Sequence, residues 1–133
     1  MSFTFHLPGL PALGIAALLA ALAQGALAAP SPAHAEIDAL LGRLASSGCE
    51  FNRNGSWYPG AEARTHLQRK LGYLEDKDAV PTTEKFIELG ASTSSSSGKP
   101  YLVKCGNAAP VDSGAWLRTQ LTAMRAAAHA PKP

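Results

Sequence analysis

The sequence predicts one small α+β domain, in which helices pack around a short antiparallel sheet of three strands. Its 133 residues have room for a single domain. Four stretches repeat apolar residues every three or four positions, whereas three shorter ones alternate or are rich in aromatic and β-branched residues. So short a chain cannot cover both faces of such a sheet. We therefore predict the order α-β-β-α-α-β-α.

Residues 1–35 have a different character from the rest, because they contain no Asp, Glu, Lys or Arg. Leu10 to Ala29 is almost entirely apolar, and Ala-x-Ala patterns follow at 26–28 and 33–35. This arrangement is typical of a secretory signal peptide. Prolines precede the second pattern and keep the chain extended, which favours cleavage after Ala35 over cleavage after Ala28. The alternative is an uncleaved membrane anchor, since a run of about 20 apolar residues can span a bilayer.

The mature chain is then predicted to be one exported domain of residues 36–128 with a disordered tail of 129–133. Its first predicted helix covers 35–47 and ends before Gly48. The apolar stripe of this helix consists of Ile37, Leu40, Leu41 and Leu44. A β-hairpin follows, because residues 49–53 alternate and Asn54-Gly55 favours a tight turn before Ser56-Trp57-Tyr58.

A second helix is predicted over 59–77 and a short third one after the N-cap Thr82, with Glu84 in its first turn. The second has one apolar face, made of Ala63, Leu67, Leu71 and Leu74. Residues 92–98 are nearly all Ser and Thr, which indicates a loop. A strand over 101–105 follows, and a last helix extends from residue 112 or 113 to Ala128.

Cys49 and Cys105 are the only cysteines, and an exported protein enters an oxidising compartment. We therefore expect a disulfide between them. The alternative is a reactive thiol pair, but the chain has no Cys-x-x-Cys motif, and neither cysteine clearly begins a helix.

Motifs for known chemistry are incomplete. The segment Ser97-Gly98-Lys99-Pro100 lacks the earlier Gly and the following helix of a phosphate-binding P-loop. His66 is the one histidine outside the terminal segments, and with two bridged cysteines it cannot form a zinc site. A net charge of +2 is too mild for a protein that binds nucleic acid by neutralising phosphates. We expect no cofactor, no metal and no nucleic-acid partner.

A polar group of residues remains as a candidate ligand-binding site. His66 and Lys70 lie one helical turn apart, and the Ser-rich loop could fold back beside them and the hairpin turn. The candidates are Arg53, Asn54, His66, Lys70, Ser94, Ser95, Ser97 and Lys99. Converging cations and hydroxyls would suit a carboxylate, a phosphate or glycan hydroxyls. The alternative is a set of surface residues on separate faces, with Arg53 and Lys99 solvated or paired with Glu62 and Glu50. Trp57 and Tyr58 could stack on a sugar ring or belong to the core.

Four separate segments carry a resemblance to a known family, over about residues 36–125. They are Cys49-Glu50-Phe51-Asn52-Arg53-Asn54-Gly55, Glu62-Ala63-x-x-His66-Leu67-x-x-Lys70-Leu71, Thr83-Glu84-x-Phe86-Ile87 and Ala91-Ser92-x-Ser94-Ser95-x-Ser97-Gly98-Lys99-Pro100-Tyr101-x-Val103. Together they resemble the YfeK-like family of small exported bacterial proteins, a domain of unknown function. The resemblance implies a periplasmic protein of a Gram-negative bacterium. It supplies no activity and no catalytic residues.

Two functions are consistent with these features. The first is a non-enzymatic binding or accessory module of the cell envelope, whose partner is an envelope protein or an anionic or glycan ligand. The second is a small hydrolase or transferase that acts on an envelope component. An enzyme should carry a group with a displaced pKa in a pocket, whereas a protein-binding module should expose an apolar patch.

Overall fold

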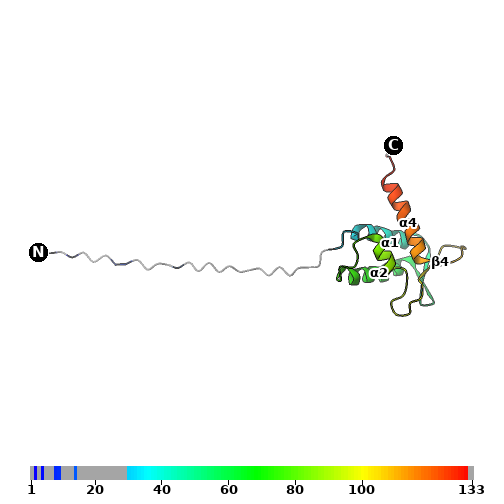
Figure 1. Cartoon of the computed structure of the whole chain (residues 1–133), viewed down its shortest axis with the longest axis horizontal. Coiled ribbons are helices and arrows are strands. Elements are labelled where there is room, and N and C mark those ends of the chain that lie inside the picture. The colour runs from blue at the N-terminus through cyan, green and yellow to red at the C-terminus, as the bar shows by residue number, and fades with distance from the viewer. Residues whose placement is uncertain (1, 3, 5–7, 10–13, 15–29, 132–133) are drawn as a thin grey trace.

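The computed structural model describes residues 2, 4, 8, 9, 14 and 30–131 (Figure 1). Most of the predicted signal peptide, including the Ala-x-Ala pattern at 26–28, lies outside the described residues. Within the described part, no helix combines the length and the apolar character needed to cross a membrane.

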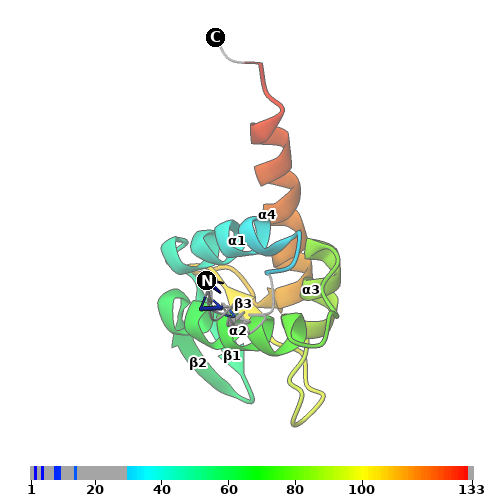
Figure 2. The same ribbon diagram turned by 90° about the vertical axis from the view of Figure 1, so that its left-hand side faces the viewer.

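The α+β class is confirmed, with the order α-β-β-α-α-β-β-α. The elements are α1 (His34–Ser46), β1 (Glu50–Arg53), β2 (Ser56–Pro59), α2 (Gly60–Glu75), α3 (Thr83–Gly90), β3 (Leu102–Lys104), β4 (Val111–Asp112) and α4 (Ser113–Ala128). The Thr82 side chain caps α3 by accepting from the Lys85 amide, as an N-cap residue should. The C-terminal half of α4 extends away from the rest of the domain (Figures 1 and 2).

The sheet has four strands rather than the predicted three, in the antiparallel order β2-β1-β3-β4. The additional strand is β4, in which Val111 pairs with Val103 and Asp112 with Leu102. Two residues cannot display an alternating pattern, so nothing local marks this strand. The β1–β2 turn is the predicted one, with positive φ angles of 52° at Asn54 and 84° at Gly55.

The core lies between the sheet and the helices. Phe51 and Val103 pair across β1 and β3 and are both buried. The four helices supply most of the other buried apolar side chains: Ile37, Leu40, Leu41, Leu44, Ala63, Leu67, Leu71, Phe86, Ile87, Leu117 and Leu121. Figure 2 shows α1 beside α2, with α3 at their end. α2 also packs against the β1–β2 hairpin.

The disulfide between Cys49 and Cys105 is present, with the two Cα atoms 4.3 Å apart. It follows from the strand register, because Glu50 pairs with Lys104 and the next residues outward face each other. The bridge therefore joins β1 to β3 at the end of the sheet opposite the hairpin turn.

The Ser-rich segment is a loop, as predicted, but its backbone is closed on itself. Thr93 and Pro100 form a β-bridge, the Ser94 amide donates to the Lys99 carbonyl, and the Gly98 amide donates to the Ser94 carbonyl. The Ser94 side chain is buried. Two further hydrogen bonds, from Lys70 to the Thr93 carbonyl and from the Ser97 hydroxyl to the Asn54 side chain, hold the loop beside α2 and the β1–β2 turn (Figure 2).

Candidate functional site

Four side chains from three parts of the fold form a connected network. His66 and Lys70 lie one turn apart on α2, Arg53 ends β1, and Tyr101 precedes β3. Arg53 Nη1 is 2.7 Å from His66 Nδ1, and His66 Nε2 is 3.2 Å from the Tyr101 hydroxyl. Lys70 Nζ donates to the Tyr101 hydroxyl at 3.1 Å and to the Thr93 carbonyl at 3.2 Å.

The donor and acceptor roles in this network follow from Arg53. A guanidinium can only donate, so His66 Nδ1 accepts and the ring proton is on Nε2. The Tyr101 oxygen then receives hydrogen bonds from both His66 and Lys70. Its two lone pairs are occupied, which leaves its own O–H free to donate to another group.

The electrostatics of the network are dominated by burial and by positive charge. Burial, with the neighbouring charges of Arg53, Lys70 and Arg69, lowers the pKa of His66 to about 4, so this imidazole is neutral at pH 7. Burial and then Arg53 also lower the pKa of Lys70. Burial raises the pKa of the Tyr101 phenol, against the opposing effect of Arg53.

The cations of this site have no carboxylate partner among the described residues. Three cations elsewhere do, because Arg64 pairs with Asp38, Lys85 with Glu88, and Arg125 with Glu36 and Glu84, whereas others in the described part, namely Arg43, Lys77, Lys99, Lys104 and Arg118, have none. Among residues 30–131, no carboxylate lies within 4.0 Å of the charged nitrogens of Arg53, Arg69 or Lys70. The expected alternative, an Arg53–Glu62 ion pair, does not form.

A concavity of about 210 Å³ lies over the network. Six of the eight candidates line it, namely Arg53, Asn54, His66, Lys70, Ser94 and Ser95, together with Ser96 and Tyr101. Ser97 lies at its edge, where its hydroxyl donates to the Asn54 side-chain oxygen at 2.7 Å. We call this concavity the polar subsite.

Lys99 does not line the polar subsite, contrary to the expectation that it would join the other cations. It lies on the returning arm of the loop, where its amide bonds to the Ser97 hydroxyl and its carbonyl to the Ser94 amide. Its side chain is exposed. Tyr101 is not among the predicted site residues, because the sequence assigns it to the predicted strand over 101–105, whereas in the structure it precedes β3.

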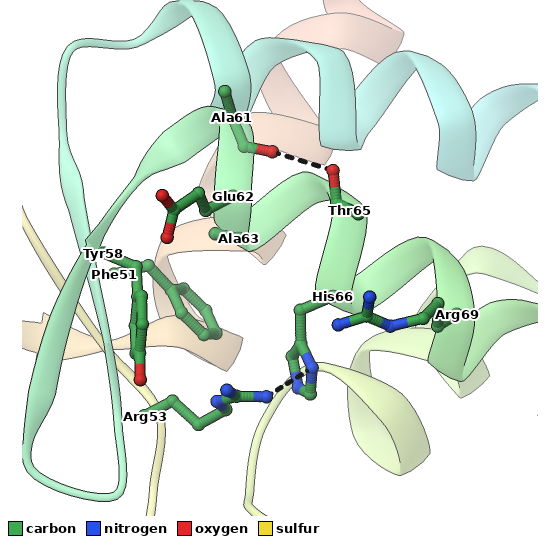
Figure 3. A pocket seen from close by; sticks show the side chains of 9 residues that line it. All are labelled: Phe51, Arg53, Tyr58, Ala61, Glu62, Ala63, Thr65, His66 and Arg69. Carbon is green, nitrogen blue, oxygen red and sulfur yellow. Dashed lines mark hydrogen bonds between the residues drawn. The ribbon is translucent and has the colours of Figure 1, made fainter.

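A second concavity, of about 410 Å³, lies between α2 and the β1–β2 hairpin (Figure 3). It shares Arg53 and His66 with the polar subsite. Figure 3 shows Phe51 and Tyr58 on the hairpin side, with the Arg53 guanidinium 5.2 Å from the centre of the Tyr58 ring. The α2 side consists of Ala61, Glu62, Ala63, Thr65, His66 and Arg69. We call this concavity the aromatic subsite.

Comparison with known proteins places the chain in a family. The sequence model of DUF5329, a family of unknown function, matches residues 31–125, which is more than half of the chain. The chain belongs to DUF5329. It is also 43% identical over 68 residues to the uncharacterized protein YfeK of Salmonella typhimurium, which confirms the resemblance to the YfeK-like family. That match covers 50% of this chain and only 55% of YfeK. No solved structure matches the chain.

The site of this DUF5329 protein is built mainly from hydrogen-bond donors. His66 accepts through Nδ1 only from Arg53, so it cannot take a proton from a substrate unless that bond breaks. Both cysteines are in the disulfide, and no group of three or more His, Cys, Asp or Glu within the described residues could hold a metal ion. An arrangement of this kind is suited to binding negative charge.

Proposed function

We propose that this DUF5329 protein is a non-enzymatic binding module of the bacterial cell envelope, and that it holds an anionic group at Arg53, Lys70 and Tyr101. The observation that carries the proposal is the convergence of these donors on one concavity whose lining, within the described part of the chain, contains no carboxylate. Half-buried cations without a counter-ion favour an anion from solution, because water solvates them only partly.

The unused donors indicate what the anion contacts. Lys70 donates two of its three N–H protons, one to the Thr93 carbonyl and one to the Tyr101 hydroxyl. Arg53 has five N–H protons, of which His66 accepts one. With the free Tyr101 O–H, these groups can donate together to the oxygens of a carboxylate or a phosphate.

The alternative function, hydrolysis or group transfer, receives less support from the site. Such a reaction needs a base that accepts a proton near neutral pH. The pKa of His66 is about 4, chiefly because of burial, and its accepting nitrogen is already bonded to Arg53. This histidine is better suited to hold Arg53 in place than to transfer protons.

Export to the periplasm belongs to the same proposal and rests on the apolar N-terminal segment. The folded unit begins before Glu36, because Ala33 is buried and the Ser31 amide and His34 Nδ1 both contact the Glu75 carboxylate, at 2.7 Å and 2.9 Å. The DUF5329 match also begins at residue 31. Cleavage after Ala35 would remove these contacts, so we propose cleavage after Ala28.

The decisive experiment is an NMR titration of the exported protein with inorganic phosphate. Saturable shifts should be confined to the amides around Arg53, Lys70 and Tyr101. The imidazole signals of His66 should report a higher pKa with phosphate bound, because the anion offsets the positive charges that now oppose protonation. Shifts that never saturate, or an unchanged His66 pKa, would contradict an anion site here.

A further inference from the structure

We infer that the aromatic subsite holds a sugar ring, so that the ligand is an acidic sugar or glycan fragment whose charged group binds in the polar subsite. The inference rests on the proposed anion-binding function and specifies the ligand class. It begins from the position of Arg53 and His66, which line both subsites.

The two subsites share the hydrogen-bonded pair of Arg53 and His66 as a common wall. We place the anion against Arg53 and Lys70 in the polar subsite, with the group covalently attached to it reaching past Arg53 into the aromatic subsite. The latter is the larger of the two, at about 410 Å³ against about 210 Å³, and lies within the range of small-molecule sites. A ligand that fills both therefore has a small charged group attached to a larger body.

The walls of the aromatic subsite differ in chemistry. One wall carries the rings of Phe51 and Tyr58, from neighbouring positions on β1 and β2. The other wall presents polar side chains of successive turns of α2, namely Glu62, Thr65 and Arg69 (Figure 3). A pyranose has a face of C–H groups and a rim of hydroxyls, so it can pack on an aromatic ring and bond to polar groups at the same time.

The charged residues of the polar wall argue against a purely apolar body. The carboxylate of Glu62 and the guanidinium of Arg69 have no ion-pair partner within 4.0 Å among the described residues. An acyl chain or a bare aromatic ring would displace their water without replacing its hydrogen bonds. Sugar hydroxyls donate to Glu62 and accept from Arg69, so they replace the lost water at both groups.

The test compares four probes on the exported protein by calorimetry and NMR: glucuronate, methyl glucoside, acetate and inorganic phosphate. Glucuronate should bind at least about tenfold more tightly than either methyl glucoside or acetate, because only glucuronate occupies both subsites. Glu62→Gln and Tyr58→Leu should remove this advantage, while phosphate binding remains saturable at Arg53.

Trp57→Leu is the matched control for Tyr58→Leu. Trp57 precedes Tyr58 on β2 and, since side chains alternate along a strand, lies on the other face of the sheet. The Trp57→Leu variant should therefore keep the full preference for glucuronate over methyl glucoside and acetate. Unchanged amide spectra of each variant outside the site establish that it is folded.

The outcomes separate the two proposals. If glucuronate binds no better than acetate while phosphate binds at Arg53, the anion site holds and the sugar subsite is wrong. If Tyr58→Leu also weakens phosphate binding, the variant has displaced Arg53, and Glu62→Gln becomes the deciding variant. Loss of the preference for glucuronate in Glu62→Gln supports the sugar subsite, and an unchanged preference contradicts it. If none of the four probes binds, both proposals fail.

Discussion

Arg53 at the end of β1 donates to Nδ1 of His66 on α2 across a distance of 2.7 Å, and this bond sets the proton positions throughout the site (Figure 3). It places the imidazole proton on Nε2, so this N–H donates to the Tyr101 hydroxyl. The same bond lies between the two subsites, because Arg53 and His66 each line the polar subsite and the aromatic subsite. A bond between a strand and a helix thus defines the chemistry of two pockets.

The neutral state of His66 should make stability depend on pH. Burial lowers its pKa from the ordinary value of 6.5 to about 4, so between these values the unfolded chain binds a proton that the folded protein does not. The free energy of unfolding should therefore fall as pH decreases from 6.5 to 4. We expect the free energy of unfolding to decrease by roughly 1–2 kcal/mol over this range, a figure that allows for solvent screening of the partly exposed imidazole.

Urea unfolding at several pH values measures this effect, with His66→Gln as the reference. Glutamine can accept from Arg53 and donate to Tyr101 but does not titrate. The difference in stability between wild type and variant should vary through the window from pH 6.5 to 4. A constant difference would show that His66 protonates with an ordinary pKa.

Arg53→Ala should abolish saturable phosphate binding, whereas Lys99→Ala should leave it nearly unchanged. Both changes remove one positive charge, but Arg53 lines the polar subsite and Lys99 does not. The comparison therefore separates contact with the anion from the general effect of net charge. Equal weakening in the two variants, measured at the same salt concentration, would refute the site.

Gly60 and Gly72 should respond in opposite ways to alanine. A Cβ at Gly60, the first residue of α2, would collide with the backbone carbonyl of Leu44 in α1, so Gly60→Ala should destabilise by about 1–3 kcal/mol. A Cβ at Gly72 has no neighbouring atom within 4 Å. Gly72→Ala should stabilise α2 by about 0.5–1 kcal/mol, and thermal unfolding of both variants checks the pair.

Loss of the disulfide should lower the melting temperature by well over about 10 °C. The bridge joins residues separated by 56 positions, for which the loss of chain entropy in the unfolded state corresponds to about 4 kcal/mol. A Cys49→Ser, Cys105→Ser double variant and the reduced wild type should show similar losses. Two free thiols in the denatured, non-reduced protein would contradict the bridge.

The exported protein should begin at Ala29. Cleavage after Ala28 keeps Ser31 and His34 in contact with Glu75, whereas cleavage after Ala35 divides α1. Intact mass of the periplasmic fraction distinguishes the two products. A full-length species in the membrane fraction would instead favour the anchor, and a chain engineered to begin at Glu36 should melt at a lower temperature than one that begins at Ala29.

Much of the fold could be predicted because its determinants are local. The four apolar residues of α1 recur within two turns, and the Asn54-Gly55 turn needs only two residues. The Thr82 cap involves only the amide of Lys85, three residues further along the chain. β4 could not be predicted because its two residues form a strand only through pairing with β3. The pairing of the cysteines followed from their number and from the export signal, and the register of β1 and β3 explains it.

The candidate site divides in the same way. The helical spacing of His66 and Lys70 is sufficient by itself to place both on one side of α2. The sequence could not show that Tyr101 receives both of their hydrogen bonds, because that contact spans more than thirty residues and depends on where the segment before β3 lies relative to α2.

The amino-acid sequence alone determined the class of fold, the helices, the hairpin and a set of polar residues, because periodicity, turns and caps act within a few positions. Only the tertiary structure decided which of those residues meet. It brought Arg53 to His66, left Lys99 on the returning arm of the loop, and opened the aromatic subsite beside Tyr58. Such contacts depend on how α2 packs against the hairpin, which is a property of the whole core rather than of any short segment.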